Sequence, residues 1–196
     1  MTDIIEGMSQ KSFESDNNIN TIIKNRHKKV SADMPYPPIR VERPNLRYAG
    51  ILSFDFAAPN SELTAVNQYL YQNWALRPKY QDIAEITKDV AKVEMHHLQI
   101  LGSLIVLLGG NPTYSVIKKD ANQKECVCVW NGTMLSYTTV LRQATINNIK
   151  MEQQTINTYR THMKIIKDRH INAILERIIA DELIHLNIFN DILKTI

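Results

Sequence analysis

Residues 94–100 (EMHHLQI) and 182–188 (ELIHLNI) share the pattern E-x-x-H-L-x-I. Each segment lies within a run of apolar residues spaced three and four apart, which predicts the buried stripe of a helix. Around the second segment, that stripe continues through Ile178 and Phe189. Residues three apart on a helix lie about 5–6 Å from each other at Cβ. The sequence therefore predicts two helices that each point a glutamate and a histidine toward one core.

Two single glutamates precede these motifs at similar distances. Glu62 lies 32 positions before Glu94, and Glu152 lies 30 positions before Glu182. A tyrosine follows each single glutamate by seven positions, and both tyrosines are expected on the same buried stripes. These tyrosines either hydrogen-bond to a metal ligand or are ordinary core aromatics, and the sequence leaves both readings open. The repeat predicts that each half of the chain is a helix pair with the same placement of polar groups.

The expected clustering of acidic side chains requires compensating charge. A buried unpaired carboxylate costs several kcal/mol or becomes protonated. Two divalent cations would balance four carboxylates, and neutral histidines would add nitrogen ligands. Four-helix bundles that hold two iron or two manganese ions use this ligand set. The alternative places each glutamate in solvent and each histidine in an ordinary core. The predicted metal ligands, for two metal ions per chain, are Glu62, Glu94, His97, Glu152, Glu182 and His185.

The chain divides into an N-terminal arm, residues 1–44, and a bundle, residues 45–196. The arm is rich in Asn, Ser, Lys and Pro, which favours extended or disordered chain. Pro59 is expected to kink or restart the first helix. The long connection at 109–132 can run the length of a bundle, so the predicted fold is all-α with one long crossover. The four predicted helices cover 45–75, 80–108, 134–166 and 168–195.

The composition restricts the kinds of partner that the protein is expected to bind and the cellular compartment in which it is expected to occur. A net charge of +3 is too small to indicate nucleic acid or an anionic membrane. The longest apolar run, 100–108, is too short to span a bilayer, and no signal peptide is evident. Cys126 and Cys128 form neither a disulfide framework nor a zinc or rubredoxin motif, which fits a cytoplasmic protein. The basic stretch 24–47 either meets an anionic partner or packs on the bundle or a second subunit.

Two segments resemble a known group of proteins. Residues 58–63 (APNSEL) resemble the Gly-Pro-Asp-Gly-Glu-Leu segment of manganese catalases and related spore-coat proteins. Residues 93–98 (VEMHHL) resemble those proteins and the rubrerythrin-like domains. Over 45–195 the chain resembles the ferritin-like superfamily. The resemblance implies a ferritin-like bundle in which Glu182 handles protons near the metals, as a general base, while the other five residues are direct ligands. Full manganese catalases are longer, and rubrerythrins usually carry an added cysteine-rich module.

The leading functional hypothesis is redox chemistry at a pair of metal ions, manganese or iron. The expected substrate is hydrogen peroxide, consumed in a catalase-like or peroxidase-like reaction, or else dioxygen. One alternative is a structural or spore-coat protein with a retained metal site. Another is ferroxidase activity with iron storage. A homo-oligomer, dimer or higher, is expected, with the arm wrapping a neighbour. His162 and His170, off the helix stripes, are expected to be solvated.

Overall fold

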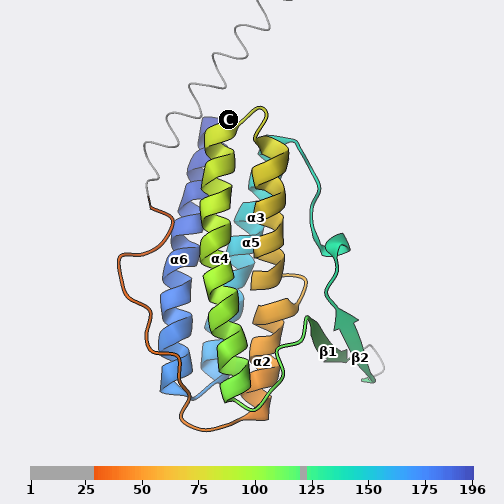
Figure 1. The fold of residues 1–196 in the computed structure, drawn as a ribbon, viewed down its shortest axis with the longest axis vertical. Helices are drawn as coiled ribbons and strands as arrows, with labels where there is room; N and C mark the ends of the chain where they lie inside the picture. The colour runs from red at the N-terminus through yellow and green to blue at the C-terminus, as the bar shows by residue number, and fades with distance from the viewer. Residues whose placement is uncertain (1–28, 120–122) are drawn as a thin grey trace, which may run out of the picture.

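The computed structural model describes residues 29–119 and 123–196, and it has the predicted architecture of a mostly helical bundle (Figure 1). Long helices run side by side, and a small antiparallel hairpin stands beside one end of them. The helices are α2 (Leu46–Ala57), α3 (Glu62–Leu76), α4 (Gln81–Leu107), α5 (Leu141–Ile165) and α6 (Arg169–Thr195). The strands are β1 (Ser115–Lys119) and β2 (Glu125–Val129). The predicted all-α four-helix bundle is confirmed, since the hairpin lies within the crossover.

The first predicted helix is two helices, because the chain breaks around Pro59. The side chain of Asn45 caps α2 by accepting a hydrogen bond from the Tyr48 amide. The hydroxyl of Ser61 caps α3 by accepting from the Thr64 amide. This second cap makes Glu62 the first residue of α3. The N-terminus of a helix carries partial positive charge, so this position favours a carboxylate.

The apolar core is in two parts with a polar layer between them. On α4, Val90 belongs to one apolar cluster and Leu101 to the other. On α6, Phe189 belongs to the same cluster as Val90, and Ile178 belongs to the same cluster as Leu101. The glutamate and the histidine of each E-x-x-H motif fall between these positions. Helix α4 is long and apolar enough to span a membrane by length and composition alone, but in this fold it packs as one of the helices of the bundle.

The crossover is more structured than the sequence predicted. Strands β1 and β2 pair antiparallel, with Val116 opposite Cys128. The next helix was predicted to begin near residue 134, but α5 begins at Leu141 after a short 3-10 turn and an extended segment. The Gln68 side chain explains the late start, because it binds the backbone of Ser136 through both its oxygen and its nitrogen, at 2.7 and 2.9 Å. These two bonds hold the segment extended against α3.

The described part of the arm, residues 29–44, contains no helix and packs on the bundle. The Arg177 side chain on α6 donates hydrogen bonds to the backbone oxygens of Met34 and Ala32, at 2.7 and 3.0 Å. Packing on the bundle is thus one of the two roles expected for this basic stretch. Three of its seven basic residues, Lys24, Arg26 and Lys28, lie outside the described residues.

Gly110, just after α4, lies where the chain approaches α2 closely. A Cβ at this position would lie 2.8 Å from the Cβ of Ala49 and 3.0 Å from Cγ2 of Ile105. We expect Gly110→Ala to lower the free energy of unfolding by about 1–3 kcal/mol through overpacking. Gly50→Ala in α2 is the control, because, apart from its chain neighbours and the backbone of its own helix, no described residue places an atom within 4 Å of its Cβ position, and it should stabilise by about 0.5–1 kcal/mol. Urea denaturation measures both, and an unchanged midpoint for Gly110→Ala would contradict this packing.

Candidate metal centre

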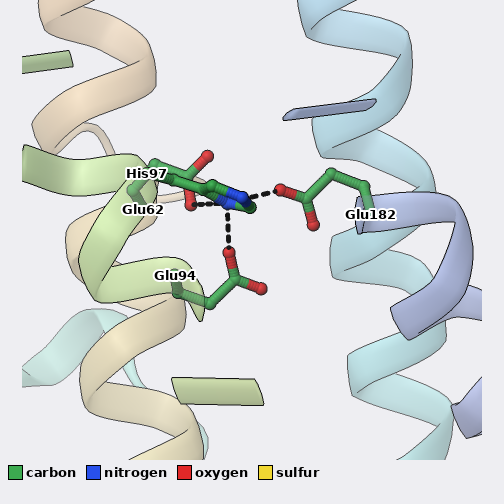
Figure 2. Close-up of side chains that lie close together, drawn as sticks. All are labelled: Glu62, Glu94, His97 and Glu182. Carbon is green, nitrogen blue, oxygen red and sulfur yellow. Dashed lines mark hydrogen bonds and ion pairs between the residues drawn. The ribbon is translucent and has the colours of Figure 1, made fainter. Parts of the chain in front are cut away.

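The structure brings all six predicted ligands together in the polar layer. Each of the four bundle helices α3, α4, α5 and α6 contributes, and each side chain is at most 2% exposed. Figure 2 shows four of them, with Glu62, Glu94 and Glu182 around His97. The complete set is Glu62 from α3, Glu94 and His97 from α4, Glu152 from α5, and Glu182 and His185 from α6.

These side chains form two groups that share two members. Glu62 and His97 complete one group, and Glu152 and His185 complete the other. Glu94 and Glu182 belong to both groups. Within each group the candidate ligand atoms lie within 4.8 Å of one another. The arrangement is that of two adjacent sites bridged by two carboxylates.

The two shared glutamates are placed alike. One oxygen of Glu94 lies 2.9 Å from Nδ1 of His97, and its other oxygen lies 2.9 Å from Nδ1 of His185. The two oxygens of Glu182 lie 3.1 and 3.2 Å from the same two nitrogens. Each carboxylate therefore presents one oxygen to each half of the cluster. This placement differs from the role implied by the family resemblance, in which Glu182 stands beside the metals as a base.

Hydrogen-bond partners define the tautomer of both histidines. Nε2 of His185 lies 2.8 Å from the backbone oxygen of Val30, which can only accept, so Nε2 carries the hydrogen. Nε2 of His97 lies 3.1 Å from a carboxylate oxygen of Asp181, which leads to the same assignment. In the neutral ring, each Nδ1 then presents a lone pair to the glutamates. Lone pairs that face each other at about 3 Å require a cation or a proton between them.

The donor set fits two metal ions. One oxygen each of Glu94 and Glu182 is buried and accepts no hydrogen bond from the residues described. Two ligand atoms at right angles on one ion, with bonds of about 2.1 Å, are about 3 Å apart. The nitrogen-to-oxygen distances to the shared glutamates, 2.9–3.2 Å, match that spacing. Carboxylate and imidazole ligands suit manganese and iron.

In the metal-free cluster, protons take the place of the cations. Burial raises the pKa of Glu62 and Glu152 well above the ordinary value, and the charges of Glu182 and Glu94 raise it further. Burial would also raise the pKa of Glu94 and Glu182, but the two histidines lower it below the ordinary value. Burial would lower the pKa of each histidine, yet the surrounding carboxylates raise it well above the ordinary value. The metal-free cluster therefore retains protons that two cations would displace.

The metal-free protein should lose stability as pH rises above about 6.5. The pKa of His97 and of His185 is raised in the folded state, so their contribution is complete below the unfolded pKa and declines above it. The raised pKa of Glu62 and Glu152 acts in the same direction. We expect a decline of about 1–3 kcal/mol per pH unit. Urea denaturation in chelator at pH 6.5, 7.5 and 8.5 measures it, and stability that rose with pH would contradict it.

Asp181 lies behind His97, and the sequence pattern did not reveal its role. One of its oxygens accepts from the Ala32 amide at 2.7 Å, and the other accepts from the Tyr36 hydroxyl and from Nε2 of His97. Arg177 lies 2.6 Å from Asp181 and stacks on the Tyr36 ring at 4.1 Å. Burial would raise the pKa of Asp181, but these hydrogen bonds hold it well below its ordinary range. Asp181 thus stays ionised and orients His97.

The arm covers the histidine side of the cluster. The backbone oxygen of Val30 holds His185, and the hydroxyl of Tyr36 lies 3.0 Å from Nε2 of His97. Burial raises the pKa of Tyr36 to about 12, so this hydroxyl stays protonated. The arm was predicted as extended or disordered chain that could pack on the bundle, and the structure adds that residues 30–36 hold the outer nitrogens of both histidines.

The two tyrosines of the sequence repeat bind across the two halves. Tyr69 donates to a carboxylate oxygen of Glu152, and Tyr159 donates to one of Glu62. Of the two readings that the sequence left open, the hydrogen bond to a predicted ligand is therefore the one observed. Burial raises the pKa of both tyrosines, and the neighbouring glutamates raise it further, so both remain donors.

Known protein families and sequences include relatives of this chain. The family model of the ferritin-like domain matches residues 58–196. A probable manganese catalase of Clostridium acetobutylicum is 24% identical over 171 residues, which cover 81% of this chain and 75% of that protein.

Two solved structures have similar folds. The manganese catalase KatB from Anabaena PCC7120 is similar with a TM-score of 0.70 and 21% identity, over 83% of this chain and 78% of that one. A bacterioferritin of Desulfovibrio desulfuricans, described with a diiron site, is similar with a TM-score of 0.62 and 25% identity, over 76% and 78% of the two chains.

Proposed function

This chain belongs to the ferritin-like domain family, and from that premise we propose that its clustered carboxylates and imidazoles hold two metal ions that consume hydrogen peroxide. The observation that carries the proposal is the pair of ligand groups that share Glu94 and Glu182. The similarity to a probable manganese catalase supports the choice of peroxide and favours manganese.

The protein side chains create the conditions for this chemistry. Two manganese or iron ions, each able to change its charge by one, supply the two electrons that peroxide exchanges. Glu62 and Glu152 complete the two ends of the cluster, and each is held by a tyrosine from the other half of the chain. In the neutral ring of His97, Asp181 holds the hydrogen at Nε2, so that the lone pair at Nδ1 would be available to a metal ion. The burial of all six residues excludes bulk water from the cluster.

In this proposal Glu182 is a shared ligand. Both of its oxygens lie within 3.2 Å of histidine nitrogens that face the cluster, as the oxygens of Glu94 do. If each oxygen of Glu182 were to bind one metal ion, neither would remain free to act as a general base. The proposal therefore replaces the general-base role, which the family resemblance implied, with a bridging one.

Oxidation of iron(II) by dioxygen is a second candidate. The observation that favours it is the symmetry of the cluster, in which Glu94 and Glu182 are placed alike toward the two histidines. Two equivalent sites with shared bridges suit a pair of identical iron ions. The similarity to a bacterioferritin with a diiron site supports this candidate as well.

The test begins with metal content. Protein from cells supplied with manganese and iron is analysed by inductively coupled plasma mass spectrometry, and about two ions per chain are expected. The double variant Glu94→Ala/His185→Ala should lose them, while Met95→Ala, exposed on the same helix, should keep them. A folded wild-type chain without metal would refute the metal centre.

Measurements of turnover then distinguish the candidate functions. Manganese-loaded protein should release oxygen from hydrogen peroxide, or consume peroxide when an organic donor is present. Rapid oxidation of added iron(II) without peroxide consumption would favour the ferroxidase candidate. Metal-dependent melting without either reaction would indicate the structural role that the sequence left open.

A further inference from the structure

A groove distinct from the metal cluster lies between α2, the end of α5 and the hairpin. Its volume is about 690 Å³, within the range of small-molecule sites. Two side chains that can carry charge, Arg47 and His162, line it. The apolar part of the lining comes from all three elements and includes Ile51, Phe54, Val116, Ile117, Val127 and Ile165.

His162 enters this groove with a buried carboxylate behind it. Its Nδ1 lies 2.8 Å from Asp55, which is 5% exposed and sits on α2. The prediction that His162 is solvated was therefore wrong, because α2 supplies a partner that its position on α5 did not reveal. A carboxylate accepts, so Nδ1 donates to Asp55, and in the neutral ring Nε2 is an acceptor. Nε2 makes no hydrogen bond with the part of the chain that the structure describes.

We propose that this groove binds a small phenol or hydroquinone. The apolar walls suit an aromatic ring, and the acceptor at Nε2 of His162 matches the O–H donor of a phenol. Arg47 lines the same groove and offers N–H donors to a second oxygen. A buried carboxylate that orients a histidine toward a bound hydroxyl is an arrangement suited to proton abstraction.

The ligand would be the reductant of a peroxidase-like reaction, and this part rests on the function proposed above. Hydroquinone gives up two electrons and two protons to become quinone, and hydrogen peroxide takes up both to become two waters, so the pair balances. His162 accepts a phenolic proton at Nε2. It lies one turn from Tyr159 on α5, and Tyr159 donates to Glu62 of the cluster. One turn of α5 therefore separates a residue that lines the groove from a residue that hydrogen-bonds to the cluster.

Binding can be tested on the full chain without metal, independently of peroxide chemistry. The probe is 2-naphthol, followed by its fluorescence, and 2-methoxynaphthalene is the matched analogue without an O–H. Naphthol should bind saturably, and His162→Gln should raise its Kd by about 3–10-fold while the methoxy analogue is unaffected. Equal binding of the two probes to the wild-type protein would overturn the role of His162.

Two substitutions in the hairpin provide a second test, at exposed positions where the core of the bundle is not disturbed. Val127 lines the groove and Val129 does not, and both are exposed on β2, at 65% and 62%. Val127→Asp should weaken naphthol binding at least about tenfold, because it buries a charge against an aromatic ring, and Val129→Asp should not. If Val127→Asp instead dissociates a dimer, with no naphthol binding in the wild type, a second copy occupies the groove and the proposal fails.

Metal-loaded protein with hydroquinone and peroxide completes the test. Quinone formation, followed by absorbance, supports the reductant role. Naphthol binding without quinone formation would overturn that role and leave the groove as a binding site. Oxygen release from peroxide without naphthol binding would overturn the groove and leave the proposed function standing.

Discussion

Removal of the metal ions is expected to lower the free energy of unfolding by about 5 kcal/mol near neutral pH. A ligand that binds only the folded state at 100 times its Kd contributes about 2.7 kcal/mol, and the cluster offers two candidate sites. For a chain of this length, that difference corresponds to a fall of about 10–20 °C in Tm. Scanning calorimetry of loaded protein, with and without chelator, measures it.

The control for this experiment is the double variant Glu94→Ala/His185→Ala. It removes one shared glutamate and one terminal histidine, so both sites lose ligands. Its Tm should be the same with and without chelator. A chelator-dependent shift in this variant as large as in the wild type would mean that the metal acts elsewhere on the chain.

Asp181→Asn is expected to lower metal affinity by about 10–100-fold, although Asp181 belongs to neither ligand group. The amide can no longer serve as an anionic acceptor for Nε2–H of His97, so the ring loses its orientation. Arg177, only 5% exposed, also loses its carboxylate partner. Leaving a buried charge unpaired costs about 3–5 kcal/mol. Competition against a chelator of known affinity measures the first effect, and urea denaturation measures the second.

The Tyr36→Phe variant distinguishes the loss of metal affinity from the loss of stability. It removes one hydroxyl from His97 and Asp181 but leaves the pair between Asp181 and Arg177 intact. We expect a fall in metal affinity of about tenfold or less and only a small change in stability. If Asp181→Asn bound metal as tightly as the wild-type protein, Asp181 would have no part in orienting His97.

The polar layer was predictable because it interrupts a regular pattern. A glutamate and a histidine three residues apart stand out in an apolar stripe, and the second copy of the pattern removes most of the chance of coincidence. The helices of the bundle follow from the same periodicity, as does the break at Pro59. The clustering of Glu62, Glu94 and Glu182 therefore follows from the spacing of these residues along the chain.

The residues that hydrogen-bond to the predicted ligands from the arm and from α6 could not be predicted from this pattern. Tyr36 lies 145 positions from Asp181 in the sequence, in an arm with no periodic pattern. The only local hint was that Asp181 directly precedes Glu182 and follows Arg177 by one helical turn, and many solvated helices show such pairs. The late start of α5 likewise depends on a contact between Gln68 and Ser136, which is tertiary.

The crossed bonds of the two tyrosines have a consequence for how the chain is synthesised. Tyr69 holds a glutamate that emerges from the ribosome 83 residues later, and Glu62 precedes its partner Tyr159 by 97 residues. The first helix pair is therefore translated before either of these two tyrosine–glutamate hydrogen bonds can form, and domains generally fold as units. Metal captured by the nascent first half would meet an open, incomplete set of ligands. The complete set of candidate metal ligands therefore exists only after α6 has been translated.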